Sequence, residues 1–295
     1  MATHAESWGC TVFELRELGS GLGYRTELAD MIDQHADRID WLEVITEHFL
    51  FAPTDKRERL HALAARFPIV PHGVEMSIGS GCEVDGDYLE ALAALVAEID
   101  APWFSDHLCF TRTDQVALGV LAPLPRTRET ARLLGRRAQK VQDAVGAPFL
   151  LENITYYVNL AGPLSEAQFI AEVMENCECH LLLDLTNLDI NARNHDFDPL
   201  EFLDTIPVER VAQVHLAGGE DGDDRELSLD THGEPVPPRV WDLLAELVGR
   251  TTVQATLVER DRNFPDDPYE LLVEIDQART LLRRSPAGPS MTGST

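Results

Sequence analysis

The chain has 295 residues, of which 44% are hydrophobic, so it can form two average domains or one α/β barrel with a large core. Its 51 acidic and 24 basic side chains give a formal net charge of -27, which argues against nucleic acid as a partner because phosphate backbones require a basic face. No apolar run reaches the ~18 residues of a membrane span and no signal peptide is recognisable, so we expect a cytoplasmic protein that does not engage membranes. The odd number of cysteines, five, predicts free thiols.

Short apolar stretches bounded by turn residues recur along the chain and predict buried strands. In chain order they cover residues 19–24, 41–45, 69–74, 103–108, 149–152, 180–184, 211–216 and 256–259. Helical patterns lie between them, at residues 28–36, 56–66, 89–96, 133–145, from 165, 200–203, 238–248 and 267–284. Residues 109–126, 187–198 and 217–238 are predicted to be loops.

The strict alternation of eight strands with helices predicts a parallel sheet. Eight repeats favour a closed (β/α)₈ TIM barrel, with a doubly wound open sheet as the alternative. We expect one barrel domain over residues 18–284, preceded by an N-terminal lead-in at 1–17 and followed by a disordered tail at 285–295. In such a barrel the carboxyl ends of all strands meet at one face, which carries the chemistry.

Metal-type side chains stand at the carboxyl ends of six predicted strands. They are His72, Asp106 with His107, Glu152 with Asn153, Asp184, His215 and Glu259, and the loop after His215 adds Asp230 and His232. Any one of them could be a packed histidine or a helix-capping carboxylate, but six strand ends together indicate one shared site. Carboxylates gathered at one face of a barrel repel one another unless cations or protons neutralise them.

The side chains of this set offer nitrogen and oxygen donors and no thiolate, which suits iron, manganese, zinc or magnesium. The number of donors exceeds what one metal needs, so two or three ions bridged by a carboxylate are favoured. Glu152 lies on the fifth predicted strand, between the early and late donors, and is the expected bridge. Asp106, His107, Asn153 and Asn187 can bind a metal or orient a ligand.

Several stretches of the chain resemble a known family. They are GLGYR from Gly21, PHGVEMSIGS, WFSDHL, LLENITYYV, LLLDLTNLDINARNH, VHLAGG, LDTHGEPV and LVERDRNFP, and they occur in the family order. The family is DUF692, the multinuclear non-haem iron oxidative enzymes of the MbnB and TglH type. The resemblance implies a xylose-isomerase-like barrel with two or three irons of mixed valence and dioxygen as co-substrate. It also implies oxidation of a residue, usually cysteine, in a ribosomally synthesised precursor peptide, together with a partner protein that binds the leader peptide.

The resemblance also assigns roles to residues. It makes His72, His107, Glu152, Asp184, Asn187, His215, Asp230, His232 and Glu259 expected iron ligands. Glu152, Asp184 and Asn187 are the expected catalytic residues, and His48, Asn153 and Asp261 the expected substrate contacts.

Four positions differ from the family pattern. Leu28 and His48 stand where a histidine and an asparagine are usual, Gly219 replaces a histidine, and Asp196 replaces a glycine after Asn194 and His195. These changes leave two other functions open: a metal-dependent hydrolase or sugar isomerase of the same barrel class, and a non-catalytic metal-bound scaffold that binds a peptide. The isomerase alternative lacks a lysine at a strand end, because the two lysines are Lys56 and Lys140.

Overall fold

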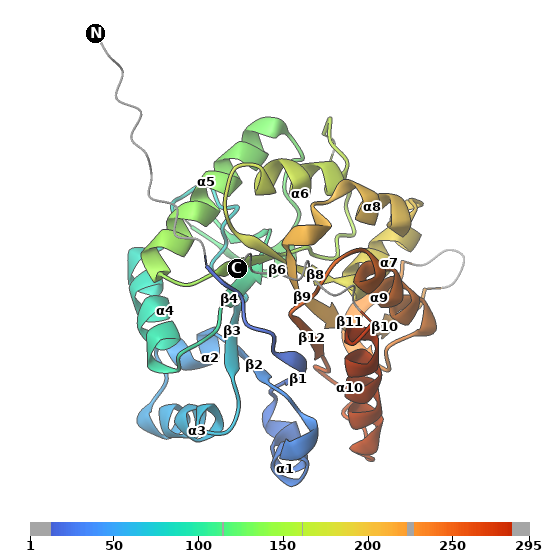
Figure 1. Ribbon diagram of the computed structural model, residues 1–295. Coiled ribbons are helices and arrows are strands. Elements are labelled where there is room, and N and C mark those ends of the chain that lie inside the picture. The colour runs from blue at the N-terminus through green and yellow to red at the C-terminus, as the bar shows by residue number, and fades with distance from the viewer. Residues whose placement is uncertain (1–12, 114, 161, 223–226, 285–295) are drawn as a thin grey trace, which may run out of the picture.

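The computed structural model describes residues 13–113, 115–160, 162–222 and 227–284, and eight parallel strands among them close into a barrel (Figure 1). They are β1 (Gly19–Gly23), β2 (Leu42–Ile45), β3 (Ile69–Gly73), β4 (Phe104–His107), β7 (Phe149–Glu152), β8 (His180–Asp184), β9 (Val211–Leu216) and β12 (Ala255–Val258). Each strand pairs with the barrel strand next to it in sequence, and β1 pairs with β12 to close the ring. The TIM-barrel prediction is therefore confirmed and the open sheet is excluded.

Helices surround the barrel and follow the strands in turn. They are α1 (Ala29–Gln34), α2 (Glu47–Leu50), α3 (Thr54–Ala64), α4 (Gly86–Glu98), α5 (Arg128–Val145), α6 (Glu166–Met174), α7 (Leu185–His195), α8 (Pro199–Thr205), α9 (Pro238–Arg250) and α10 (Tyr269–Leu282). The long α5 shows how local sequence sets the bounds: the Thr127 hydroxyl caps its first turn, and Gly146 takes the left-handed conformation (φ 77°) that ends it. No helix among the described residues is long and apolar enough to cross a membrane.

Two apolar layers hold the barrel together. The larger one packs the helices against the outside of the strands. The smaller one fills the barrel interior at the amino ends of the strands with Trp41, Val70, Trp103, Leu150, Leu182, Ala212, Ala255 and Leu257, and Leu15 and Leu18 pack against it. Because this end is filled by bulky side chains, polar groups are left to occupy the opposite, carboxyl end.

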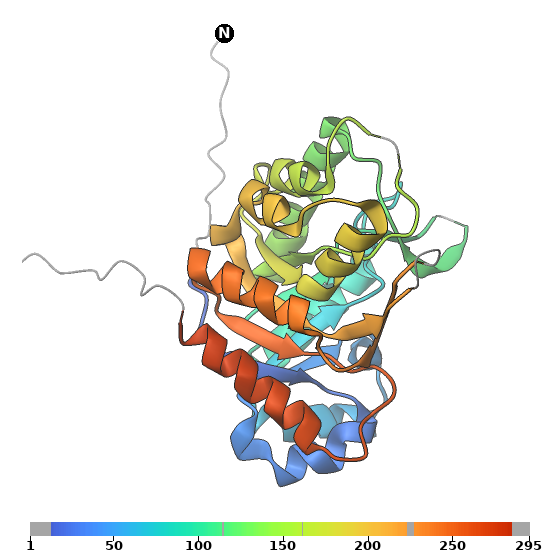
Figure 2. The same cartoon turned by 90° about the vertical axis from the view of Figure 1, so that its right-hand side faces the viewer.

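The predictions of loops at residues 109–126, 187–198 and 217–238 were wrong in part. The first contains a hairpin of β5 (Phe110–Arg112) and β6 (Ala117–Ala122), and the third one of β10 (Gly218–Glu220) and β11 (Leu229–Glu234). Most of the second is helix α7, which Asp184 caps by accepting a hydrogen bond from the Asn187 amide. Figure 2 shows that both hairpins project from the same end of the barrel.

Smaller expectations were also tested. The helix expected at residues 89–96 is α4, which begins earlier because the Asp85 carboxylate caps it by accepting hydrogen bonds from the amides of Asp87 and Tyr88. The four described cysteines are free, as predicted, whereas Cys10 lies outside the described residues. The predicted disordered tail and most of the N-terminal lead-in lie outside them too.

Candidate metal centre

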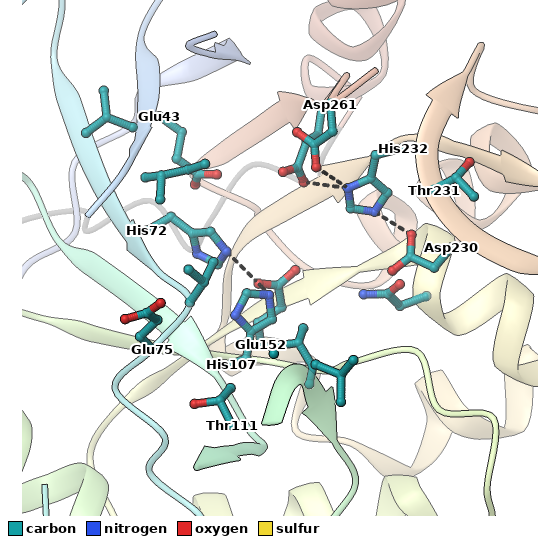
Figure 3. A pocket seen from close by; sticks show the side chains of 18 of the residues that line it. Glu43, His72, Glu75, His107, Thr111, Glu152, Asp230, Thr231, His232 and Asp261 are labelled. Atoms are coloured by element: carbon teal, nitrogen blue, oxygen red, sulfur yellow. Dashed lines mark ion pairs between the residues drawn. The ribbon is translucent and has the colours of Figure 1, made fainter. Parts of the chain in front are cut away.

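The carboxyl end of the barrel brings three adjoining groups of metal-type side chains together. Figure 3 shows His72 and His107 beside Glu152, and His232 beside Asp230 and Asp261. The first group consists of His72, His107 and Glu152. Glu152 Oε2 lies 3.2 Å from His72 Nε2 and 3.1 Å from His107 Nε2. Strand register explains the contact, because His107 on β4 stands directly beside Glu152 on β7.

Shared carboxylates link the first group to the other two. The second group consists of Glu152, Asp184 and His215, and the third of Asp184, His232 and Glu259. The other carboxylate oxygen of Glu152, Oε1, lies 3.2 Å from His215 Nδ1. Glu152 therefore offers one oxygen to each of two groups, which is the geometry that a bridging ligand needs.

Buried polar atoms without a hydrogen-bond partner test whether this site fits metal ions. Five buried atoms here form no hydrogen bond of good geometry among the described residues, although they face one another or the other histidines in ion-pair contacts: Glu152 Oε2, Asp184 Oδ2, His215 Nδ1, Asp230 Oδ1 and His232 Nε2. Leaving a buried polar atom unsatisfied costs roughly 1–3 kcal/mol, so a cluster of them in a folded protein requires an explanation. Metal ions would satisfy these atoms, and an oxygen- and nitrogen-donor set of this kind suits them.

Hydrogen bonds on the far ring nitrogens orient the histidines toward the centre. His72 Nδ1 lies 2.8 Å from Ser105 Oγ, and His107 Nδ1 lies 3.1 Å from the Gly73 carbonyl oxygen. The carbonyl can only accept, so His107 Nδ1 carries the proton and Nε2 presents a lone pair to Glu152 and its neighbours. Such second contacts are typical of metal-binding histidines.

His215 is oriented in the same way by a residue that the sequence reasoning missed. Glu43 is buried inside the barrel, and its carboxylate lies 3.1 Å from His215 Nε2. Gln213 donates a hydrogen bond of 2.6 Å to Glu43 and accepts one of 2.7 Å from the Trp103 indole N–H. This chain of contacts leaves His215 Nδ1 facing Glu152 and Glu259.

The ionisation of the cluster shows how strongly its charges depend on one another. The neighbouring histidines lower the pKa of Glu152 to about 2 despite its burial. Burial raises the pKa of Asp184 to about 8 despite the opposing charge of His232. Burial opposes protonation of His215, but Glu43 and the other carboxylates raise its pKa well above its usual value. Protons on His215 and His232, whose pKa values the neighbouring carboxylates raise, thus balance part of the negative charge in the metal-free cluster, and metal ions would replace them.

The remaining predicted ligands lie at the edge of the groups. Asp230 Oδ1 lies 2.8 Å from His232 Nε2, and the backbone of His232 takes the left-handed conformation (φ 43°) that residues with side chains adopt only when their surroundings enforce it. Asn187 lines the cavity above the groups, and its carbonyl oxygen accepts a hydrogen bond of 2.5 Å from Thr155.

The three predicted substrate contacts occupy different places. Asp261 lines the cavity and accepts a hydrogen bond of 2.8 Å from Arg25. Asn153 lies deeper, where its amide forms two hydrogen bonds of 2.9 Å with the backbone of Asp184. His48 is exposed on α2, outside the cavity wall.

The cavity over the metal groups has a volume of about 530 Å³. Its walls come from the carboxyl ends of the strands, from the β5–β6 hairpin and from β11. Arg25 is a second wall residue that the sequence reasoning missed. Its guanidinium is paired with Glu259 at 3.0 Å and with Asp261, so its charge is already neutralised within the site.

The departures from the family pattern have structural counterparts. Leu28 is buried in the apolar core, and Asp196 takes the left-handed conformation (φ 54°) at the end of α7, where a glycine is usual. A side chain at Gly219 would meet the Leu229 carbonyl oxygen at 2.4 Å, so a histidine fits there only if the β10–β11 hairpin shifts. None of these changes removes a member of the three metal groups.

Two relatives are similar to this chain over most of its length. The chain is 40% identical to a UPF0276 protein of Caulobacter vibrioides over 265 residues, which cover 88% of this chain and 93% of that protein. It is 35% identical to a UPF0276 protein of Pseudomonas aeruginosa, over 90% of this chain and 93% of that one.

Solved structures of the same fold are much more distant in sequence. A D-psicose 3-epimerase from Clostridium cellulolyticum superposes with a TM-score of 0.56 at 13% identity, over 90% of this chain and 99% of the other. A xylose isomerase-like TIM barrel protein from Mycobacterium smegmatis in complex with magnesium gives 0.56 at 12% identity, over 87% and 88%. These likenesses confirm a xylose-isomerase-like barrel. The family described as "RiPP precursor modification enzyme MbnB/TglH/ChrH" matches residues 19–283, and the chain belongs to this family.

Proposed function

We propose that this protein is a multinuclear non-haem iron enzyme that uses dioxygen to oxidise a residue, cysteine in the first instance, of a ribosomally synthesised precursor peptide. The observation that carries the proposal is the cluster of three donor groups joined through Glu152 and Asp184, with unpartnered ligand atoms in each. Family membership supports peptide modification as the setting of this chemistry.

The residues of the site suit two or three ions. His72, His107 and Glu152 would hold one, Glu152, Asp184 and His215 a second, and Asp184, His232 and Glu259 a third. Asp230 and Asn187 are proposed as further ligands at the edges of these groups. When bound, iron supplies a binding position for a thiolate and the electrons that dioxygen takes up.

The other side chains have supporting roles in this proposal. Asn153 fixes the backbone of Asp184, a proposed bridging residue, and Glu43 holds His215 in the tautomer that faces the metals. Asp261 stands in the cavity wall as a substrate contact, and exposed His48 would contact a longer peptide that extends beyond the cavity. The apolar barrel interior beneath the cluster excludes water from the metal ligands on that side.

No thiol of the protein itself competes for the metals within the described part of the chain. Cys109 is the cysteine nearest in sequence to a proposed ligand, and it is fully buried. Burial raises the pKa of its thiol far above the usual range, so it remains protonated and is a poor metal ligand. A thiolate at the metals would therefore come from the substrate.

The proposal is tested with any short cysteine-containing peptide that is encoded beside the gene, together with any neighbouring protein that binds its leader. We expect the iron-loaded protein to consume dioxygen and to change the mass of a cysteine-containing fragment of the peptide. Oxygen-independent turnover of sugars or phosphodiesters, or peptide binding without any product, would instead support the hydrolase, isomerase or scaffold alternatives.

A further inference from the structure

One arginine that lines the cavity over the metal groups has no ion-pair partner among the described residues. Two arginines line this cavity, Arg25 and Arg112. Arg25 is committed to Glu259 and Asp261. No hydrogen bond or ion pair joins the Arg112 guanidinium to another residue in the ranges that the structure describes, although it is half-buried in a strongly acidic protein.

The backbone at Arg112 is held on both sides by two buried serines. Ser77 Oγ accepts hydrogen bonds from the amides of Thr111 (2.8 Å) and Arg112 (3.3 Å). Ser80 donates to the Arg112 carbonyl oxygen, and the two serine hydroxyls contact each other at 2.8 Å. Ser77 itself takes the left-handed conformation (φ 56°), an enforced geometry of the kind that clusters at functional sites. The start of the side chain is thus fixed at the cavity wall.

Arg112 lies in a cavity wall that a ligand must pass to reach the metal groups. Thr111 and Arg112 belong to β5, and the facing strand β6 contributes Ala117, Gly119, Val120 and Leu121 to the same wall. His72 and His107 line the cavity as well, so a ligand that reaches the first metal group passes this wall. A guanidinium binds carboxylates through two parallel hydrogen bonds, and a fixed backbone lowers the entropy lost on binding.

The geometry points to Arg112 as the anchor for a carboxylate of the substrate, which positions the neighbouring substrate residue over the metal groups. This inference rests on the proposed function for the identity of that neighbouring residue, a cysteine. The carboxylate can come from the main-chain end of the substrate or from an acidic side chain, and both present the same two oxygens to the guanidinium.

Two matched ligand pairs test the anchor and separate its sources. N-acetyl-L-cysteine and N-acetylcysteamine differ by a terminal carboxylate, whereas the C-terminally amidated dipeptides N-acetyl-cysteinyl-aspartate and N-acetyl-cysteinyl-asparagine differ by a side-chain carboxylate. Their affinities for the metal-loaded protein are measured by calorimetry without oxygen. We expect the carboxylate member of at least one pair to bind the wild-type protein roughly 10- to 100-fold more tightly.

Variants identify the residue responsible. Arg112→Gln should abolish the preference for the carboxylate member and leave the affinity of the uncharged member unchanged, and Arg112→Lys should keep part of the preference. Arg262→Gln is the matched control, because Arg262 is half-exposed, pairs with Glu220 at 2.6 Å and does not line the cavity. If Arg112→Gln retains fewer metals than the wild type, the comparison is made with Arg112→Lys alone.

Each outcome has a defined meaning. The anchor is overturned if neither pair shows a carboxylate preference in the wild type. It is also overturned if the full wild-type preference persists in Arg112→Gln, or undiminished in Arg112→Lys, because the metals would then bind the carboxylate. N-acetyl-L-alanine separates this result from failure of the proposed function. If it binds as tightly as N-acetyl-L-cysteine and still depends on Arg112, the anchor stands and the thiolate assignment fails.

Discussion

Replacing Glu152 with alanine should remove more than one metal ion from the protein. Its two carboxylate oxygens serve different groups: Oε2 lies 3.2 and 3.1 Å from the His72 and His107 rings, and Oε1 lies 3.2 Å from that of His215. Two of the three groups therefore lose their shared oxygen ligand. Loss of a hydrogen-bonding partner behind a ligand already lowers metal affinity about 10- to 100-fold, so loss of the ligand itself should cost more at both positions.

The assay is the metal content per chain after purification without oxygen, with circular dichroism to confirm that the variant is folded. Only the group of Asp184, His232 and Glu259 is complete in Glu152→Ala, so we expect one retained ion where the wild type holds three. Glu166→Ala is the control, because this carboxyl lines a separate cavity. A variant with the metal content of the wild type, or with two ions where the wild type holds three, would refute the bridging role of Glu152.

Three further predictions follow from contacts around the centre. Ser105→Ala removes the partner of His72 Nδ1 and should weaken binding of the ion held by His72, His107 and Glu152 about 10- to 100-fold, measured by chelator competition; unchanged retention would contradict this. Gly73→Ala would place a methyl group 2.2 Å from an Asp106 oxygen and should lower the free energy of unfolding by about 1–3 kcal/mol, whereas Gly86→Ala, with open space around it, should be near neutral. Burial raises the folded-state pKa of Glu274 to about 7, so the stability that its proton supplies is lost as pH rises from about 4.5 to 7. In the metal-free protein, Glu274→Gln should make the decrease in the free energy of unfolding over this pH range smaller by on the order of 3 kcal/mol. Chemical unfolding at several pH values measures this, and a pH profile identical to that of the wild type would contradict the prediction.

The barrel and most of the site could be predicted from the sequence because both depend on a short-range pattern. Six of the eight strands are apolar runs with a histidine or carboxylate near the carboxyl end, so position alone places His72, Glu152 and Asp184 at one face. The same rule could not find Glu43, which lies in the middle region of the short β2, or Arg25, which follows β1 as a cation. A buried carboxylate within an apolar run was the available signal for Glu43.

Helix α7 shows why the loop predictions failed. Its sequence is polar because its inward side chains hydrogen-bond to the segment after β7, so the apolar periodicity that marks a helix is missing. Asn191, for example, is fully buried, accepts a hydrogen bond from the Tyr156 amide and donates one to the Ile154 carbonyl oxygen. The Asp184 cap was the one local signal of this helix, and it was interpreted as a metal ligand alone.

The metal content of the wild-type protein, purified without oxygen and without added metal, tests the central claim most directly. Elemental analysis combined with Mössbauer spectroscopy should find two or three irons per chain that are coupled to one another. Zinc or manganese at a stoichiometric level with no iron, or a single isolated ion, would contradict a multinuclear iron centre built on Glu152 and Asp184.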